Sequence, residues 1–249
     1  MDRFTLLRSL TLSRCSVDLV EQILNRIEKS LLEKISISSC KRILGKRFSL
    51  TQHLLSAERY PLLRSINLKL CARNMVYLHD VEISIEKLNR LKYLSLDRSS
   101  EIEDLSNIFY RSPNLQSLNT VLNNLTDSSF TLTGIIKSLV LSRLKLTSSI
   151  IQQSTLIYLL EKFPNLTFLH LEFSTSSSNL TDSKYWKSLL EKMHFLKYVY
   201  IRMIIQLLET NLLREDVRER VKLLERPLYF TRVLINRMNT IRIVINGIK

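Results

Sequence analysis

The amino-acid sequence predicts an α/β solenoid in the form of a horseshoe, with parallel strands on the concave face and helices on the convex face. Three observations predict it. A motif of the form Leu-x-x-Leu-x-Leu recurs along the chain, and both the cysteines and the prolines keep fixed places relative to that motif. Chance apolar runs would not align Leu, Cys and Pro in one register, so the chain is built from one repeated unit.

The apolar motif occurs eight times, with Ile, Val or Thr in place of Leu at some positions. Successive motifs start 21 to 31 residues apart, with a mean of 27, which is the period of leucine-rich repeats. In each motif the first, fourth and sixth side chains of a short strand are expected to point inward. The triplets are Leu7/Leu10/Leu12, Leu32/Ile35/Ile37, Leu63/Ile66/Leu68, Leu91/Leu94/Leu96, Leu115/Leu118/Thr120, Ile136/Leu139/Leu141, Leu166/Leu169/Leu171 and Leu196/Val199/Ile201.

A small residue recurs at one place in the repeat. Cys15, Cys40 and Cys71 each follow the first leucine of their motif by eight residues, and Asn123 does the same in the fifth repeat. We expect this structural slot to satisfy inward-facing backbone groups. Stacked repeats would also bring the thiols close, so a zinc site or a disulfide is the alternative. An odd number of cysteines favours reduced thiols in the cytoplasm or nucleus.

Three of the four prolines also share one register. Pro61, Pro113 and Pro164 lie two residues before the first leucine of a motif, where a proline ends a helix and favours an extended strand. The stretches between the strands show helical spacing and predict amphipathic helices on the convex face. Their apolar positions are Val17, Val20, Ile23, Leu24, Ile27, Leu105, Ile108, Phe109, Ile151, Leu156, Leu159, Leu160, Phe163, Trp186 and Leu189.

Polar residues before two of these helices are expected to act as N-caps: Asp18 before the first and Thr181-Asp182-Ser183 before the last. The repeats are expected to fill residues 1–202 with about eight units, and 203–249 to form a C-terminal capping segment. Within that segment we expect a mixed-charge helix at 214–220 and one short strand at 241–245. The first motif follows Met1 closely, so either a segment upstream or a partner is expected to cover the first repeat.

Aligned on these motifs, the chain resembles the leucine-rich-repeat region of F-box proteins, the substrate-binding subunits of cullin-type ubiquitin ligases. The resembling pieces include Leu7-Arg-Ser-Leu-Thr-Leu-Ser-Arg-Cys15, Ser112-Pro-Asn-Leu-Gln-Ser-Leu118 and Phe163-Pro-Asn-Leu-Thr-Phe-Leu-His-Leu171. The resemblance implies a substrate receptor that binds protein. It departs from the family because the F-box is not in this sequence, so a Skp1-like adaptor is implied only if an F-box lies upstream.

The sequence contains no set of residues at a spacing that catalysis or metal binding requires. The four histidines, His53, His79, His170 and His194, are scattered over different repeats, and no CxxC or HxxxH pair occurs. Only three glycines in the chain leave no phosphate-binding loop, and no apolar stretch is long enough to cross a membrane. We therefore expect no enzyme, no metal and no cofactor.

Three Asn-Leu-Thr sequences, at Asn124, Asn165 and Asn179, match the glycosylation acceptor pattern of secreted proteins. Without a signal peptide, chance is the preferred interpretation. Asn165 also belongs to a Pro-Asn-Leu sequence at the start of a strand, which gives it a structural role instead.

The third, fifth and seventh positions of each motif are expected to face the concave groove. In the early repeats these residues are small and polar, whereas the last two repeats carry aromatic rings and an arginine, which often anchor protein interfaces. The alternative is that the rings only cover the end of the sheet where the C-terminal segment folds back. The predicted partner-binding residues are Tyr93, Phe168, His170, Tyr198, Tyr200 and Arg202.

A basic rim is expected beside the groove, at the second position of the motifs. With 37 Lys and Arg against 23 Asp and Glu, the chain carries a formal charge of +14. This charge permits a second hypothesis, a solenoid that binds RNA or another phosphate-rich partner. The predicted rim residues are Arg8, Arg64, Lys92, Lys137 and Lys197, interrupted by Glu33, Gln116 and Thr167.

Overall fold

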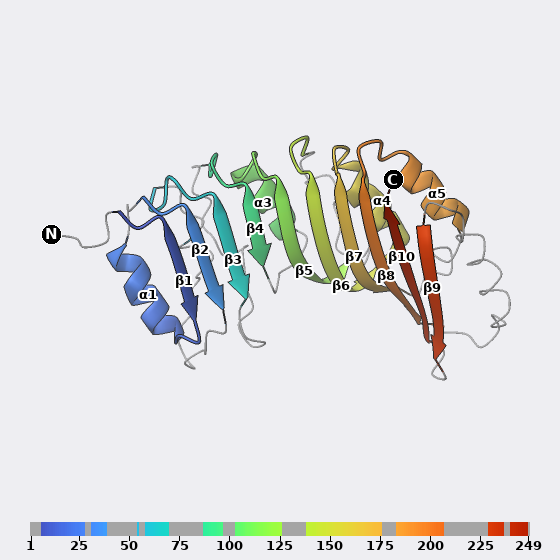
Figure 1. Ribbon diagram of the computed structural model, residues 1–249, viewed down its shortest axis with the longest axis horizontal. Coiled ribbons are helices and arrows are strands. Elements are labelled where there is room, and N and C mark those ends of the chain that lie inside the picture. Colours follow the sequence, from blue (N-terminus) through green and yellow to red (C-terminus); the bar gives the residue numbers. More distant parts are fainter. Residues whose placement is uncertain are drawn as a thin grey trace. The chain divides into compact units, whose positions relative to one another are not determined.

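The computed structural model divides into two compact units, Met1–Val121 and Leu122–Lys249. Each unit combines helices with strands of one open β-sheet (Figure 1). The described residues are 6–27, 31–38, 54, 58–69, 87–96, 103–125, 138–175, 183–206, 229–236 and 240–248.

Among the described residues, five strands begin in the first unit and pair in chain order, each parallel to the next. The last of them extends past Val121 into the second unit. They are β1 (Ser9–Ser13), β2 (Lys34–Ser38), β3 (Ser65–Lys69), β4 (Tyr93–Leu96) and β5 (Ser117–Leu125). The helices that the structure describes between these strands are α1 (Val17–Arg26) and α3 (Glu103–Arg111). In Figure 1, α3 lies behind the strands.

In the described part of the second unit, three further strands run parallel: β6 (Arg143–Ile151), β7 (Phe168–Thr175) and β8 (Tyr198–Gln206). The helices α4 (Gln153–Glu161) and α5 (Ser183–Glu191) connect them. Two further strands close the chain: β10 (Thr240–Ile248) pairs antiparallel with β8, and β9 (Tyr229–Asn236) pairs antiparallel with β10. The prediction of an α/β fold with parallel strands is thereby confirmed for both units.

The repeat motif accounts for the core of both units, because its apolar positions are the ones buried from β2 to β8; those of β1, at the start of the sheet, are half-buried. Side chains along a strand alternate between the two faces, and the observed burial alternates in the same way. Between the strands, the buried helix residues follow the helical spacing. The buried motif residues, on the strands or just before them, include Leu32, Ile35, Ile37, Leu63, Ile66, Leu68, Leu91, Leu94, Leu96, Leu115, Leu118, Leu166, Leu169, Leu171, Leu196, Val199 and Ile201.

Backbone hydrogen bonds keep successive repeats in register at the second motif position. The carbonyl of Arg64 accepts from the amides of Lys92 (2.9 Å) and Tyr93 (3.0 Å). In the second unit the carbonyl of Thr167 accepts in the same way from Lys197 (2.9 Å) and Tyr198 (3.0 Å). Residues at equal motif positions therefore lie side by side on neighbouring strands, and the motif position gives the row in which a side chain lies.

Pro61, Pro113 and Pro164 each occupy the second residue of a tight turn, before β3, β5 and β7 respectively. Leu115 donates its amide to the carbonyl of Ser112 at 3.1 Å, with Pro113 between them, and proline is favoured at this turn position because its φ is already set. The asparagine after the proline then connects two repeats: Asn165 Nδ2 donates to the carbonyl of Leu139 at 2.6 Å. This contact is the structural role predicted for Asn165.

The sixth motif lies five residues later than the sequence analysis predicts. The strand pairing places Arg143 opposite Phe168 and Leu144 opposite Leu169, so the inward triplet is Leu141/Leu144/Leu146 and not Ile136/Leu139/Leu141. Leu144 is 2 % exposed, whereas Leu139 is 59 % exposed. With this correction, the motifs start 24 to 31 residues apart, a narrower range than before.

Two predicted helix boundaries also need correction. The N-cap of α1 is Ser16, whose Oγ accepts a hydrogen bond from the amide of Leu19 at 3.2 Å. Asp18 lies in the first turn, where its negative charge interacts favourably with the helix dipole. Ile151 is the last residue of β6 and not part of α4. Helix α5 begins at Ser183, and the other two predicted cap residues, 181 and 182, lie outside the described residues.

The C-terminal part of the chain forms strands where the structure describes it. Strand β8 continues to Gln206, four residues beyond the predicted end of the repeats. The predicted strand at 241–245 is confirmed as part of β10, which pairs with β8 along its length. The mixed-charge segment at 214–220 lies outside the described residues.

Candidate interaction site

In each unit the strands have an open face, which we define by the third, fifth and seventh motif positions, whose described side chains are exposed or half-buried. In the first unit this face is small and polar. Asn67 Nδ2 donates to Ser36 Oγ at 3.4 Å, and Asn119 Nδ2 donates to Ser95 Oγ at 3.0 Å. These bonds link neighbouring strands, so these amide and hydroxyl groups support the sheet.

The open face of the second unit carries a different set of side chains. Strand pairing arranges them in rows that cross β6, β7 and β8, with charged groups between aromatic rings. We call these eight residues the aromatic–ionic cluster: Arg143, Lys145, Phe168, His170, Glu172, Tyr198, Tyr200 and Arg202.

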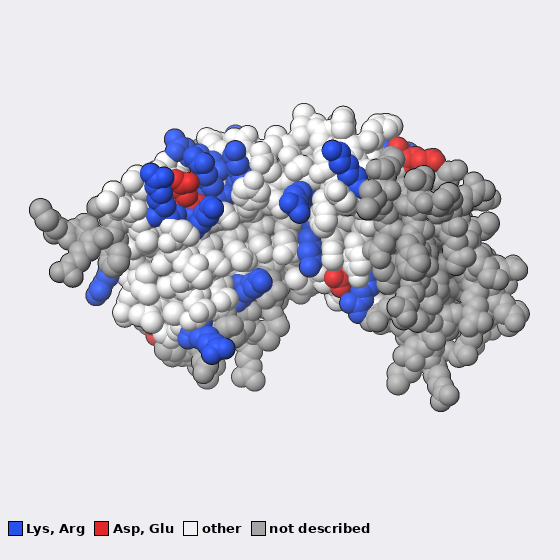
Figure 2. All heavy atoms as spheres, viewed as in Figure 1, with Lys and Arg blue, Asp and Glu red and all other residues white. Residues whose placement is uncertain are grey.

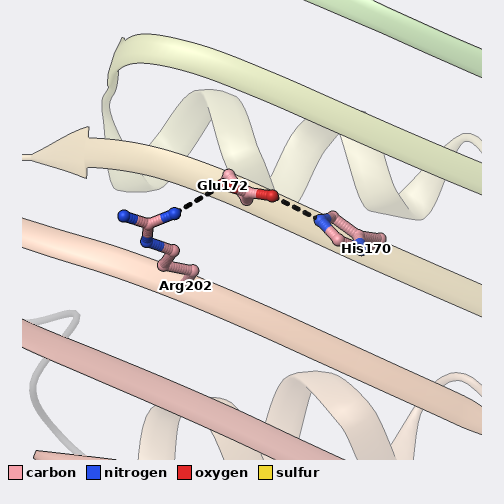
Figure 3. Close-up of polar contacts among 3 residues, drawn as sticks. All are labelled: His170, Glu172 and Arg202. Atoms are coloured by element: carbon pink, nitrogen blue, oxygen red, sulfur yellow. Dashed lines mark hydrogen bonds and ion pairs between the residues drawn. The ribbon is translucent and has the colours of Figure 1, made fainter.

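A chain of polar contacts runs through this cluster, centred on the carboxylate of Glu172 (Figure 3). His170 Nε2 lies 2.7 Å from Glu172 Oε1, and Arg202 Nη1 donates to Glu172 Oε2 at 3.2 Å. A carboxylate accepts hydrogen bonds, so His170 carries its proton on Nε2 to donate here. Both carboxylate oxygens are thus engaged from within the protein.

These contacts favour the ionised form of Glu172. The hydrogen bond from His170 is the main cause that lowers the pKa of this carboxyl below its ordinary value of 4.5. The charges of His170, Arg202 and Lys145 act in the same direction, and partial burial opposes them. Glu172 therefore remains a carboxylate at neutral pH and partly neutralises the cations around it.

The aromatic rings of the cluster contact other members of it. The rings of His170 and Tyr200 have centroids 4.4 Å apart, with an interplanar angle of 31°. The guanidinium of Arg143 lies over the ring of Phe168, with Cζ 5.1 Å from the centroid, a cation–π arrangement. Tyr198 is 52 % exposed, and it is the ring of the cluster most open to solvent.

The structure brings together five of the six predicted partner-binding residues: Phe168, His170, Tyr198, Tyr200 and Arg202 all lie on β7 and β8. Tyr93 belongs to the first unit, where it is exposed on β4 between Ser65 of β3 and Ser117 of β5. Tyr93 is therefore outside the aromatic–ionic cluster.

The sequence analysis missed three members of the cluster. Arg143 and Lys145 were overlooked because the sixth motif was placed five residues too early, which assigned its groove positions to other residues. The more regular spacing of the corrected motifs was the signal that could have found them. Glu172 stands at a groove position, but only the structure shows that it connects His170 and Arg202.

The predicted basic rim is interrupted by an ion pair in the first unit. Arg8, Arg64 and Lys92 are exposed just before β1, β3 and β4, and Arg64 Nε lies 3.8 Å from Oε2 of Glu33, which precedes β2. Figure 2 shows Lys and Arg surrounding a small acidic area on the first unit. Lys197 is exposed in the second unit. Lys137 lies outside the described residues, and the corrected register puts Ser142 at the second motif position.

The structural slot is described at two of its four positions. Cys15 is half-buried with a free thiol, and its Sγ lies 3.5 Å from the carbonyl oxygen of Ser13. The backbone of Asn123 lies within β5, while Cys40 and Cys71 lie outside the described residues. Among the residues that the structure describes, no group of three or more His, Cys, Asp or Glu side chains could hold a metal ion.

No protein-family model, curated protein or solved structure matches this chain. The relation to F-box proteins therefore stays a prediction from the motifs. Within the described ranges, no helix is long and apolar enough to span a membrane.

The lowered pKa of Glu172 predicts how its contribution to stability depends on pH. Because folding lowers this pKa, the ionised carboxyl stabilises the protein above its ordinary pKa of 4.5, and this stabilisation is lost as the pH falls through the folded-state pKa. Glu172→Gln should therefore unfold more easily than the wild type near pH 6, and the difference should shrink as the pH is lowered below 4.5. Urea unfolding of both proteins across this range measures it. A difference that is constant with pH would contradict the assigned role of the charge.

Proposed function

We propose that this protein is a non-enzymatic recognition scaffold that binds a protein partner through the open face of β7 and β8. The observation that carries the proposal is the gathering of Tyr198, Tyr200 and Arg202 beside Phe168 and His170 on that face. Tyrosine and arginine are the side chains most enriched among residues that dominate binding energy at protein interfaces.

The position of these side chains on strands supports the proposal. Their backbone is fixed by hydrogen bonds to neighbouring strands, and the contacts of Glu172 with His170 and Arg202 orient two of the side chains. A surface that is already ordered loses less conformational entropy when a partner binds. Half of Tyr198 is solvent-exposed, which leaves apolar area to bury against a partner.

We further propose that the recognised protein is a substrate of a cullin-type ubiquitin ligase, which the resemblance to F-box repeats supports. In this role the chain would be joined to an F-box that binds a Skp1-like adaptor. Mapping the 5′ end of the transcript tests this part separately from binding. An upstream exon that encodes an F-box would support it, and a message that begins at Met1 would contradict it.

The binding surface is tested by replacing two of its rings. The partner is first isolated with the full chain, identified and purified, and its affinity is then measured by calorimetry. The double variant Tyr198→Ala/Tyr200→Ala is expected to bind at least about tenfold more weakly, the loss typical of a dominant interface residue.

The matched control is Tyr110→Ala, which removes an exposed tyrosine from α3 in the first unit. Its affinity for the partner should equal that of the wild type. Equal affinity of the double variant would reject the β7–β8 face as the binding surface. Circular dichroism of all three proteins checks that the variants remain folded.

A further inference from the structure

We propose that Arg143 and Lys145 bind the carboxylates of an extended acidic segment in the partner, with Asp or Glu at alternate positions. This inference rests on the proposed function, because it specifies the chemistry of the segment that the aromatic–ionic cluster recognises. It concerns the corner of the cluster on β6, which the groove residues predicted from the sequence do not include.

The first argument is the charge balance of the cluster. Arg143, Lys145 and Arg202 are cations, and Glu172 is the only carboxylate among the eight members, which leaves a net charge of +2 before His170 is protonated. Glu172 is already engaged by His170 and Arg202. Within the described residues, neither Arg143 nor Lys145 has a carboxylate at ion-pair distance. These two cations are therefore available to a carboxylate from outside.

The second argument is the spacing of the two cations. Arg143 and Lys145 are two residues apart on one strand, so their side chains leave the same face of the sheet about 7 Å apart along it. An extended peptide presents its side chains at positions i and i+2 with the same spacing. A segment that runs along β6 with acidic residues at alternate positions would place one carboxylate opposite each cation.

The third argument is the surroundings of the two cations: Arg143 lies over an aromatic ring, and Lys145 is partly buried. The guanidinium of Arg143 lies over the ring of Phe168, and a guanidinium above a ring still presents N–H donors at its edge to a carboxylate. Lys145 is half-buried on β6 beside His170 in the strand pairing, and its charge reaches Glu172. Partial burial strengthens its interaction with an anion relative to a fully solvated lysine.

The same contacts disfavour a single-stranded nucleic acid as the ligand. Stacking of bases requires open ring faces. One face of Phe168 is covered by Arg143, and the rings of His170 and Tyr200 lie against each other. Tyr198 alone does not form a stacking platform for successive bases. A protein segment that offers carboxylates to the cations and an apolar side chain to Tyr198 fits the surface better.

The test uses two displayed peptide libraries and the full chain. Both libraries are random except at alternate positions, which carry Asp or Glu in one and Asn or Gln in the other. We expect binders from the acidic library only. The best peptide should lose about tenfold in affinity with Arg143→Ala and also with Lys145→Ala, because each removes a charge-assisted contact. Lys192→Ala, which removes an exposed lysine just after α5, should bind as the wild type does.

Several outcomes would overturn the inference. They are binders from the amide library with equal affinity, acidic peptides whose affinity ignores both substitutions, or tighter binding of single-stranded RNA that requires Arg143 and Lys145. Measurements with the isolated partner separate this inference from the proposed function. If Tyr198→Ala/Tyr200→Ala weakens binding but Arg143→Ala and Lys145→Ala do not, the surface is correct and the acidic ligand is wrong. If none of these variants weakens binding, the surface itself is wrong.

Discussion

Replacing Leu144 by Ala is expected to lower the free energy of unfolding by about 2–5 kcal/mol, whereas Leu139→Ala should change it by no more than about 0.5 kcal/mol. Leu144 is 2 % exposed and lies in the row of buried residues that crosses β6, β7 and β8, so its truncation leaves a cavity. Leu139 is 59 % exposed in the turn before β6. Chemical denaturation of the two variants measures both values.

This pair of variants tests the register of the sixth repeat directly, since the two registers place different leucines in the core. A larger loss of stability for Leu139→Ala than for Leu144→Ala would support the motif predicted from the sequence, in which Leu139 is buried. It would also remove Arg143 and Lys145 from the open face, because a strand shifted by an odd number of residues presents its other side chains there. The inference of an acidic ligand would then fail with it.

Replacing Trp186 by Ala is expected to cost about 3–5 kcal/mol of unfolding free energy, the usual loss for a large buried ring. Trp186 is fully buried in α5, the helix that connects β7 to β8. The matched control is Phe195→Ala, which removes a ring that is 59 % exposed in the turn before β8 and should cost no more than about 0.5 kcal/mol.

Thermal and urea unfolding of both variants measure the difference between the two rings. Equal losses would mean that α5 does not pack its apolar side against the sheet. Because α5 connects the strands that carry Glu172 and Arg202, loss of its packing should also loosen the candidate site. Weaker binding of the partner by the Trp186 variant, measured below its unfolding transition, would show that the packing of α5 supports the candidate site.

The sheet and its core could be predicted closely from the sequence because the strand signal is repeated. A single apolar triplet is ambiguous, but seven further copies with prolines in register define where each strand starts. The prediction was wrong where local chemistry offered two registers: Leu139, Leu141 and Leu144 supply apolar residues for either one. The spacing of the motifs favours the later register, and pairing with β7, which places Leu144 beside Leu169, shows that it is the one adopted.

The candidate site could be predicted in part. Strand alternation was enough to place Phe168, Tyr198 and Tyr200 on one face, because it is a local property of the backbone. The contact between Glu172 and Arg202 crosses from β7 to β8, over 30 residues of chain. A motif position indicates that two side chains share a face, but their distance depends on rotamers and on the twist of the sheet.

The sequence by itself determined the repeated unit, the parallel strands and the alternation that separates core from open face, because these follow from the spacing of apolar residues and from backbone geometry. The tertiary structure decided between the two registers of the sixth repeat, and it alone decided the pairing of β10 with β8. It also decided that cations lie among the rings and that Glu172 is held ionised. These features depend on contacts between residues distant in the chain, and no local pattern encodes them.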